Sequence, residues 1–171
     1  MEMPDGTIVL GTRGGLCRVD IERQCYTVVT EEVGIINALC LVNDTLVIGS
    51  RNGLWVYHND KHMERIALEG TVAQRENAIN AMVTDGADGV WICTNQRLMH
   101  VTFPTRNIKK YDITPALLNG NIRTLCRIGE TLYIGPHTGA LFSFDSTNET
   151  FAPCPHFALE NIVNLSTDGT S

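Results

Sequence analysis

The sequence of 171 residues lacks an apolar run that approaches the roughly 20 residues needed to span a bilayer. Residues 1–5 include two carboxylates and no apolar segment, so we expect no secretion signal there. Positive charge is also scarce, because 13 Lys and Arg stand against 19 Asp and Glu, for a formal net charge of −6. This balance argues against nucleic acid and anionic membranes as partners, since neither attracts an acidic protein.

The composition also excludes a disordered or low-complexity protein. Charged residues make up 19% of the chain and hydrophobic residues 43%, which is typical of a folded domain. A chain of this length buries roughly 70% of the surface that its unfolded form exposes. The sequence therefore predicts one domain whose core needs no disulfide or metal.

Metal and redox motifs are missing. The chain contains no C-x-x-C sequence, and no histidine lies at a zinc-ligand spacing from a cysteine pair. Free cysteine is usually an interior residue, and most cysteines here lie within apolar runs. We therefore expect mostly buried thiols and no essential disulfide among the six: Cys17, Cys25, Cys40, Cys93, Cys126 and Cys154.

Catalytic motifs are missing too. The five histidines form no H-E-x-x-H motif, and no G-x-S-x-G sequence occurs. The glycine-rich segment 11–15 is not followed by a helical pattern, so it predicts a hairpin turn rather than a phosphate-binding loop. We expect no catalytic residue, no metal site and no cofactor.

Two series of residues recur with the same period. The first series lies in strand-like segments at intervals of 38, 44 and 42 residues, at Gly11, Gly49, Cys93 and Gly135. The second series precedes these segments at intervals of 43, 43 and 40 residues, at Ile36, Ile79, Ile122 and Ile162. Agreement between two unrelated patterns predicts four structural repeats.

Each period contains four short strand-like runs. In the second repeat these are 36–42, 45–49, 53–57 and 64–67, and the Asn52-Gly53 pair favours a tight hairpin. The nearest helix candidate, residues 69–80, is polar at its start and is interpreted as a loop between repeats. Four strands per period of about 40 residues are typical of a β-propeller blade. We predict an all-β fold of four four-stranded blades, as a closed ring or a partial propeller.

The repeats divide one propeller segment, 1–171, at about 1–34, 35–77, 78–120 and 121–160. The chain begins on a second strand at 7–11, and residues 161–171 would supply a first strand, at 162–165, to the next or the first blade. Two assemblies fit this arrangement: a monomeric four-blade ring, or an open arc that dimerises through its blade edges. We prefer the dimer, because packing fixes the wedge shape of a blade.

Segment 85–94, Asp-Gly-Ala-Asp-Gly-Val-Trp-Ile-Cys-Thr, is similar to the two-component regulator propeller repeat. Segments 54–57 and 141–145 look like the third strand of that repeat. The resemblance implies the periplasmic sensor region of a hybrid two-component histidine kinase of Bacteroides-type bacteria, in which such repeats form larger rings and sense oligosaccharides. The rest of the propeller of the parent protein would then be a partner, and no kinase motif is present in this chain.

Equivalent positions of the repeats carry polar side chains at one end of the blades. We predict a ligand site there, composed of Arg13, Arg51, Asn95 and His137 from the second-to-third-strand loops and Asn37, Asn80 and Arg123 from the first strands. Such donors and acceptors suit a hydroxyl-rich or anionic ligand. The alternative is that they are solvated turn residues and hydrogen-bonding groups between blades. Trp55 and Trp91 could stack on a sugar, but their mid-strand positions favour the core.

The predicted function is that of a non-catalytic sensor segment that responds to an oligosaccharide. One alternative is a scaffold that binds another protein through a propeller face. The other alternative is a carbohydrate-active propeller enzyme, which would need paired carboxylates or a metal site facing the channel.

Overall fold

The computed structural model describes residues 1–58, 62–68, 77–95, 97–113, 121–157, 162 and 164–166. These residues form fifteen β-strands and no helix. The strands belong to four antiparallel sheets, one of three strands and three of four strands, each ordered as in the sequence. An all-β fold of four repeats is thereby confirmed, but the first repeat forms three strands in place of the predicted four.

The strand bounds follow the repeats. The first sheet contains β1 (Ile8–Thr12), β2 (Gly15–Asp20) and β3 (Cys25–Thr30). The second contains β4 (Ile36–Val42), β5 (Thr45–Ser50), β6 (Gly53–Tyr57) and β7 (Met63–Ile66). The third contains β8 (Ala81–Thr84), β9 (Gly89–Cys93), β10 (Arg97–Thr102) and β11 (Asn107–Asp112). The fourth contains β12 (Ile122–Ile128), β13 (Thr131–Pro136), β14 (Phe142–Asp145) and β15 (Thr150–Pro153).

Tight turns set these bounds. Asn43 and Asp44 join β4 to β5 with φ of 46° and 62°, and Gly53 opens β6 with φ of 117°. Asparagine, aspartate and glycine adopt this left-handed region most readily, which explains why they stand between the strands. The strands of the second sheet consequently match their predicted bounds within one residue.

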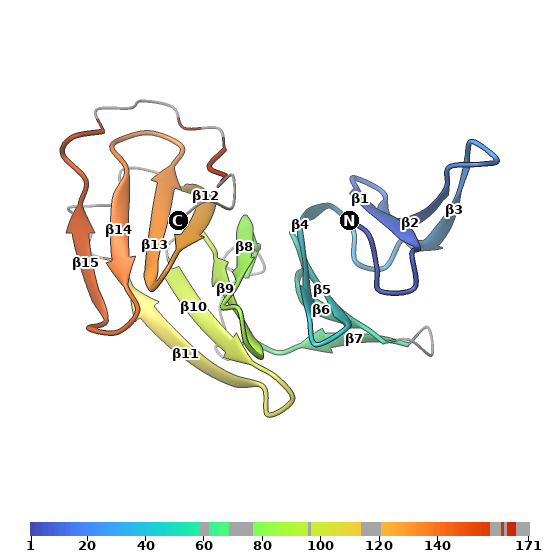
Figure 1. Ribbon diagram of the computed structural model, residues 1–171, viewed down its shortest axis with the longest axis horizontal. Coiled ribbons are helices and arrows are strands. Elements are labelled where there is room, and N and C mark those ends of the chain that lie inside the picture. Colours follow the sequence, from blue (N-terminus) through green and yellow to red (C-terminus); the bar gives the residue numbers. More distant parts are fainter. Residues whose placement is uncertain are drawn as a thin grey trace.

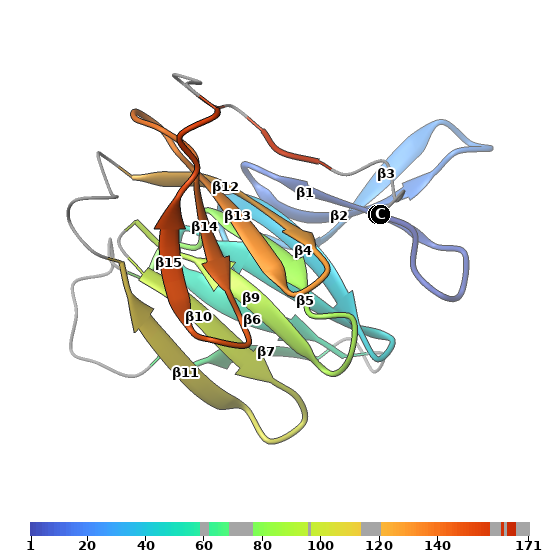
Figure 2. The ribbon, with the colours of Figure 1, turned by 60° about the vertical axis from the view of Figure 1, so that its left-hand side comes forward.

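The four sheets stand side by side as an arc (Figure 1). Strand β1 contacts β4, β4 contacts β8, and β8 contacts β12, so each sheet meets the next near the inner side of the arc. Among the described residues, no strand of the first sheet pairs with a strand of the fourth. The arc is open, and Figure 2 shows β1–β3 projecting at one end of it.

Three apolar cores lie between consecutive sheets. The first includes Val9, Leu16 and Trp55, and a second joins the β4–β7 sheet to the β8–β11 sheet. The third includes Trp91 and Phe144, between the third and fourth sheets. Trp55 and Trp91 are only 6% and 5% exposed, so their interpretation as core residues is confirmed.

The glycine and isoleucine series meet in space at three of the four repeats. A Cβ atom built on Gly11 would lie 2.4 Å from Cγ2 of Ile36, and one on Gly49 would lie 2.6 Å from Cγ2 of Ile79. One on Gly135 would lie 3.0 Å from Cγ2 of Ile162. We call this contact the glycine–isoleucine socket. The sockets join β1, β5 and β13 to the isoleucine at the start of the next repeat: Ile36 lies in β4, Ile79 precedes β8, and Ile162 lies in no assigned strand. At each of these three glycines, an added Cβ would lie within 3.0 Å of the isoleucine.

Ion pairs connect the second sheet to the third and the third sheet to the fourth at the outer rim. The carboxylate of Glu64, on β7, pairs with the Arg106 guanidinium in the β10–β11 turn. The Lys109 ammonium, on β11, pairs with the Glu149 carboxylate in the β14–β15 turn. These groups are partly exposed, so solvent screening keeps the contribution of each pair to the stability of its junction small.

The two ends of the chain differ in detail from the expectation. Residues 1–3 fold back along the free edge of β1: the Met1 amine donates to the carbonyl of Val9, and the Met3 N–H donates to the carbonyl of Thr7. The described part of the expected strand at 162–165 is not assigned as a strand. It lies on the fourth sheet, where the Leu165 N–H donates to Oγ1 of Thr124 over 3.0 Å.

All six cysteines are free thiols. Four are buried, whereas Cys25 is exposed and Cys154 is half-buried. Burial raises the pKa of Cys40 to about 11 and also raises that of Cys93.

Of the loop predicted at 69–80, residues 69–76 lie outside the described residues.

Candidate ligand-binding site

A surface depression of about 850 Å³ lies at one end of the second, third and fourth sheets. Six of the seven predicted site residues line it. The lining comprises Asn37, Arg51, Asn52, Ala78, Asn80, Asn95, Asn121, Ile122, Arg123 and His137. The sequence pattern identified the polar residues of the blade ends but missed Asn52 and Asn121, which adjoin predicted positions and share their polar character.

Antiparallel pairing explains why these residues meet. The first residue of an inner strand pairs with the last residue of the second strand, as Ile36 does with Ser50 and Ile122 with Pro136. The start of the inner strand and the turn after the second strand therefore share one edge of the sheet. The same pairing recurs in each four-stranded sheet, so the polar residues collect at one end of the arc.

Two asparagines link neighbouring sheets within the depression. Nδ2 of Asn37 donates to the carbonyl of Ile79 over 2.8 Å. Nδ2 of Asn80 donates to the carbonyl of Ile122 and to Oδ1 of Asn95, each over 2.8 Å. The interpretation of these side chains as hydrogen-bonding groups between blades thus holds for their amide nitrogens.

The two arginine side chains of the depression do not hydrogen-bond to neighbouring sheets as the asparagines do. The Arg123 guanidinium lies 2.8 Å from Nδ1 of His137. A guanidinium can only donate, so Nδ1 of His137 is the acceptor in this contact. The exposed Arg51 guanidinium has no side-chain partner among the described residues. It is available to a ligand.

The charge of the depression opposes that of the chain. Its described lining contains two arginines and one histidine but neither aspartate nor glutamate, in a protein of net charge −6. Amides and guanidinium groups bind hydroxyl and anionic oxygen atoms through hydrogen bonds. The depression therefore offers donors to an oxygen-rich ligand and no described pair of carboxylates for acid–base catalysis.

Arg13 is not part of this lining. It is exposed in the turn between β1 and β2, in the sheet that lacks a full inner strand. The walls of the depression are built from inner-strand starts and the turns beside them. Among the described residues, the first sheet has no inner strand whose first residues would lie next to Arg13.

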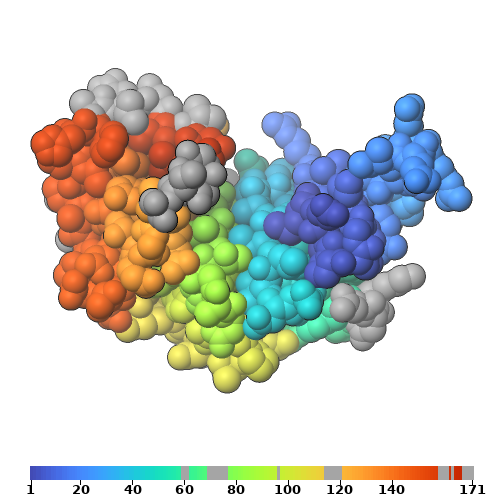
Figure 3. Space-filling model, in the orientation of Figure 1, coloured from blue at the N-terminus to red at the C-terminus, as the bar shows by residue number. Residues whose placement is uncertain are grey.

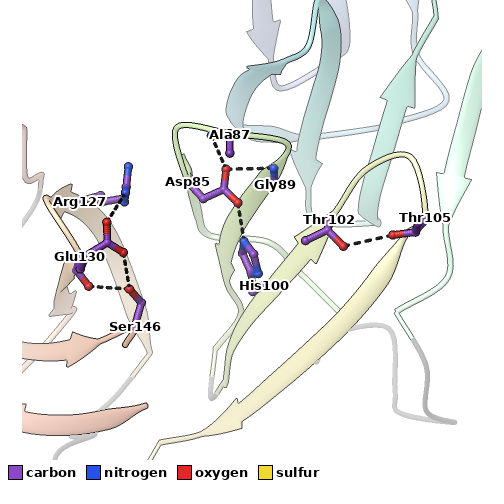
Figure 4. Close-up of polar contacts among 9 residues, drawn as sticks. All are labelled: Asp85, Ala87, Gly89, His100, Thr102, Thr105, Arg127, Glu130 and Ser146. Carbon is purple, nitrogen blue, oxygen red and sulfur yellow. Dashed lines mark hydrogen bonds and ion pairs between the residues drawn. The ribbon is translucent and has the colours of Figure 1, made fainter. Parts of the chain in front are cut away.

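A half-buried polar cluster lies at the opposite ends of β8 and β9 (Figure 4). Oδ1 of Asp85 accepts hydrogen bonds from the backbone N–H groups of Ala87 and Gly89, over 2.8 and 3.0 Å. Oδ2 of Asp85 lies 2.8 Å from Nε2 of His100, whose ring stacks on Trp91 with centroids 4.3 Å apart. The cluster fixes the turn that precedes β9 against β10.

Opposing effects act on the pKa of Asp85. Burial raises it, but the hydrogen bonds from Ala87, Gly89 and His100 lower it, and the net pKa is below the ordinary value. The carboxylate is thus ionised at neutral pH. Sequence reasoning missed this cluster, although the turn sequence Asp85-Gly86-Ala87-Asp88-Gly89 indicated an Asp-based turn.

The described residues contain no group of three His, Cys, Asp or Glu side chains arranged to hold a metal ion. A search of the same part of the chain finds no helix long and apolar enough to cross a membrane.

No known family model matches the sequence, and no curated protein matches it. Solved structures do match. The extracellular domain of the putative hybrid two-component system BT4673 from B. thetaiotaomicron is 20% identical, with a TM-score of 0.72 over 90% of this chain and 20% of that chain. The extracellular domain of BT3049 from the same organism is 18% identical, with a TM-score of 0.71 over 90% of this chain and 24% of that chain.

The chain shares its fold with these extracellular domains. It spans about a fifth of the length of the BT4673 domain and about a quarter of the BT3049 domain. The resemblance of the repeats to a two-component sensor region is thus confirmed at the level of the fold. Sqt1 of Saccharomyces cerevisiae also matches, with 12% identity and a TM-score of 0.65 over 95% of this chain and 50% of that chain.

Proposed function

We propose that the chain is a non-catalytic propeller segment of an extracellular or periplasmic sensor in a two-component signalling protein. The similar structures are extracellular domains of such systems, which supports this role. The chain covers only about a fifth to a quarter of their length, so signalling belongs to other parts of the parent protein.

The sensed ligand in this proposal is an oligosaccharide bound in the depression at the blade ends. The observation that carries the proposal is the convergence of Asn37, Asn80, Arg51 and Arg123 from three separate sheets on one concave surface. The amide oxygens of Asn37 and Asn80 can accept hydrogen bonds from sugar hydroxyls. The donors come from the guanidinium groups, since both amide hydrogens of Asn80 are already used between the sheets. The volume of about 850 Å³ falls in the usual range for small-ligand sites.

The charge of the site suggests which saccharides bind best. The Arg51 guanidinium has no side-chain partner within the described part of the chain and matches a carboxylate or sulfate group in a bidentate geometry. No described lining carboxylate repels an anion. We therefore expect acidic oligosaccharides to bind more tightly than neutral ones of the same length. A carbohydrate-active enzyme would need two carboxylates here, which the described lining does not supply.

Isothermal titration calorimetry with a panel of acidic and neutral oligosaccharides tests the proposal. We expect Arg51→Ala to weaken binding of the best ligand at least about tenfold, which is about 1.4 kcal/mol. Arg13→Ala is the matched control, because Arg13 occupies the equivalent turn outside the depression, and it should leave binding unchanged. Failure of the whole panel to bind, or equal effects of the two variants, would refute the site.

A further inference from the structure

In two of the sheets, an inner-strand residue donates a hydrogen bond to a residue of the turn beside it at the end that forms the depression. In the third sheet, Nδ2 of Asn80 donates to Oδ1 of Asn95 over 2.8 Å. In the fourth sheet, the Arg123 guanidinium donates to Nδ1 of His137, also over 2.8 Å. Each donor follows the first isoleucine of its repeat, and each acceptor lies in the turn after the second strand. The same contact is thus built twice from different residues.

The contact in the fourth sheet differs because its acceptor can take up a proton. An amide oxygen accepts hydrogen bonds at any pH near neutrality, whereas histidine is the side chain that changes its charge between pH 5 and 8. Both ring nitrogens of an imidazolium donate, so a protonated His137 can no longer accept from Arg123. Two positive charges then repel each other at this contact. Protonation of His137 therefore frees the Arg123 guanidinium.

The described lining contains no carboxylate that could pair with the freed guanidinium. Its charged and titratable side chains are Arg51, Arg123 and His137. The backbone N–H of His137 donates to the carbonyl of Asn121 over 2.7 Å, and this bond does not depend on the charge of the ring. A positive charge added at His137 is therefore balanced by no described acidic side chain of the depression.

Other charged groups on the neighbouring strands have partners of their own. Arg127 pairs with Glu130 at the opposite end of β12. Asp145, at the opposite end of β14, accepts hydrogen bonds from backbone N–H groups of the β14–β15 turn. On the third sheet, the Arg97 guanidinium pairs with the Asp112 carboxylate, and neither lines the depression.

The contact between Arg123 and His137 forms one wall of a depression that three sheets share. The space-filling view shows the second, third and fourth sheets packed side by side, from cyan through green to orange (Figure 3). The following repeat is also represented beside this wall, since Ile162 packs against Gly135, two residues before His137. The guanidinium is therefore freed next to the amides of the second and third sheets.

We propose that protonation of His137 strengthens the binding of anionic groups in the depression. This inference rests on the proposed function, because it concerns the regulation of the same site. At neutral pH, His137 holds the Arg123 guanidinium and Arg51 is the available cation. In mildly acidic solution the imidazolium adds a third positive charge, and Arg123 becomes available to the ligand. Sulfate and carboxylate groups gain charge-assisted hydrogen bonds from both, whereas a neutral saccharide gains no such charge interaction.

Isothermal titration calorimetry tests the pH dependence with a sulfated oligosaccharide and its unsulfated form. Affinities are measured at about pH 5.5 and about pH 7.5 at constant ionic strength, since histidine changes its charge between these values. A sulfate ester stays ionised at both, so a change in affinity comes from the protein. We expect the sulfated form to bind at least about fivefold more tightly at the lower pH, because one added unit charge a few ångströms away has about this effect in a high dielectric. The unsulfated form should change little.

His137→Gln is the decisive variant, and His156→Gln is its matched control. Glutamine keeps a neutral acceptor at both pH values, so the affinity of His137→Gln for the sulfated form should no longer depend on pH. His156 is also exposed but lies outside the depression, so His156→Gln should keep the wild-type dependence. His137→Lys carries a permanent charge and should bind as tightly at the higher pH as at the lower. Circular dichroism at both pH values checks that each variant is folded.

The results that would overturn this inference differ from those that would overturn the proposed function. Equal affinity of the wild type for the sulfated form at both pH values, or a pH dependence that survives in His137→Gln, overturns the inference while the proposed function stands. Loss of the dependence in His156→Gln also overturns it, because the effect would then come from the charge of the whole protein.

Titration with inorganic sulfate, followed by amide shifts in nuclear magnetic resonance spectra, provides the converse case. Sulfate binding that strengthens in acid and depends on His137, without binding of any oligosaccharide, supports this inference and refutes the saccharide ligand. If neither sulfate nor any oligosaccharide binds at either pH, both proposals are wrong.

Discussion

The glycine–isoleucine socket makes Gly49→Ala the most informative single substitution. The added methyl group would lie 2.6 Å from Cγ2 of Ile79 and 2.8 Å from Sδ of Met82. Carbon atoms in contact stay about 3.5–4.0 Å apart, so the isoleucine contact is short by about 1 Å. Ile79 is fully buried, which leaves it little freedom to move aside.

The expected cost follows from two opposing terms. Overpacking of a dense core destabilises by about 1–3 kcal/mol. Loss of glycine freedom in the unfolded chain stabilises by about 0.4–1 kcal/mol. The middle of each range gives a net loss of about 1.3 kcal/mol, which lowers the melting temperature of a protein of this size by about 3–5 °C.

Thermal and urea unfolding followed by circular dichroism measure this loss. Gly14→Ala is the matched control: a Cβ there meets only Oγ1 of Thr12, at 3.9 Å, so its stability should change little. Ile79→Ala alone costs about 2–5 kcal/mol, and because it also removes the clash, the double variant should lose less than the sum of the two changes. A melting temperature of Gly49→Ala equal to that of the wild type, or strict additivity in the double variant, would refute the socket.

Three further changes test other contacts. Asp85→Asn should lower the free energy of unfolding by about 1–3 kcal/mol at neutral pH. Because folding lowers the Asp85 pKa, the carboxylate stabilises the fold above its unfolded pKa near 3.9, and this stabilisation is lost as the pH falls through the folded pKa. In a pH series of melting curves, the variant should therefore lose less stability on acidification than the wild type. A thiol reagent should label exposed Cys25 in the native protein and buried Cys93 only after unfolding, and fast native labelling of Cys93 would contradict its burial. Asn80→Ala removes the bond to the Ile122 carbonyl and should cost about 1–2 kcal/mol in urea unfolding; unchanged stability would show that this link contributes nothing.

The repeating part of the fold could be predicted because local rules determine it. Hairpin turns at Asn43-Asp44 and Asn52-Gly53 set the strand ends, and the 43-residue spacing from Ile36 to Ile79 reports one blade per repeat. The clustering of Asn37 and Asn80 in one depression follows from the same register.

The remaining features depend on neighbours that a periodic pattern does not contain. Arg13 holds the equivalent position in the repeat, but its sheet has no full inner strand. No inner-strand residues therefore lie beside Arg13 to form a depression with it. His100 reaches Asp85 only because a turn and two strands fold back between them. Residues 1–3 lie along the free edge of β1. In the other three sheets a first strand occupies this edge, so the repeat pattern could not predict their path.

The junctions of the arc differ in how they are fastened, and this has a mechanical consequence. The second and third junctions are each held by an asparagine amide at the inner side and an ion pair at the rim. Between the described residues of the first and second sheets, only the apolar core and the Gly11 socket hold the junction together. Under a force applied to the two ends of the chain, we expect the first sheet to peel away before the others. The arc would then yield stepwise from its β1–β3 end, leaving the three four-stranded sheets, and with them the depression, together as the last unit to rupture.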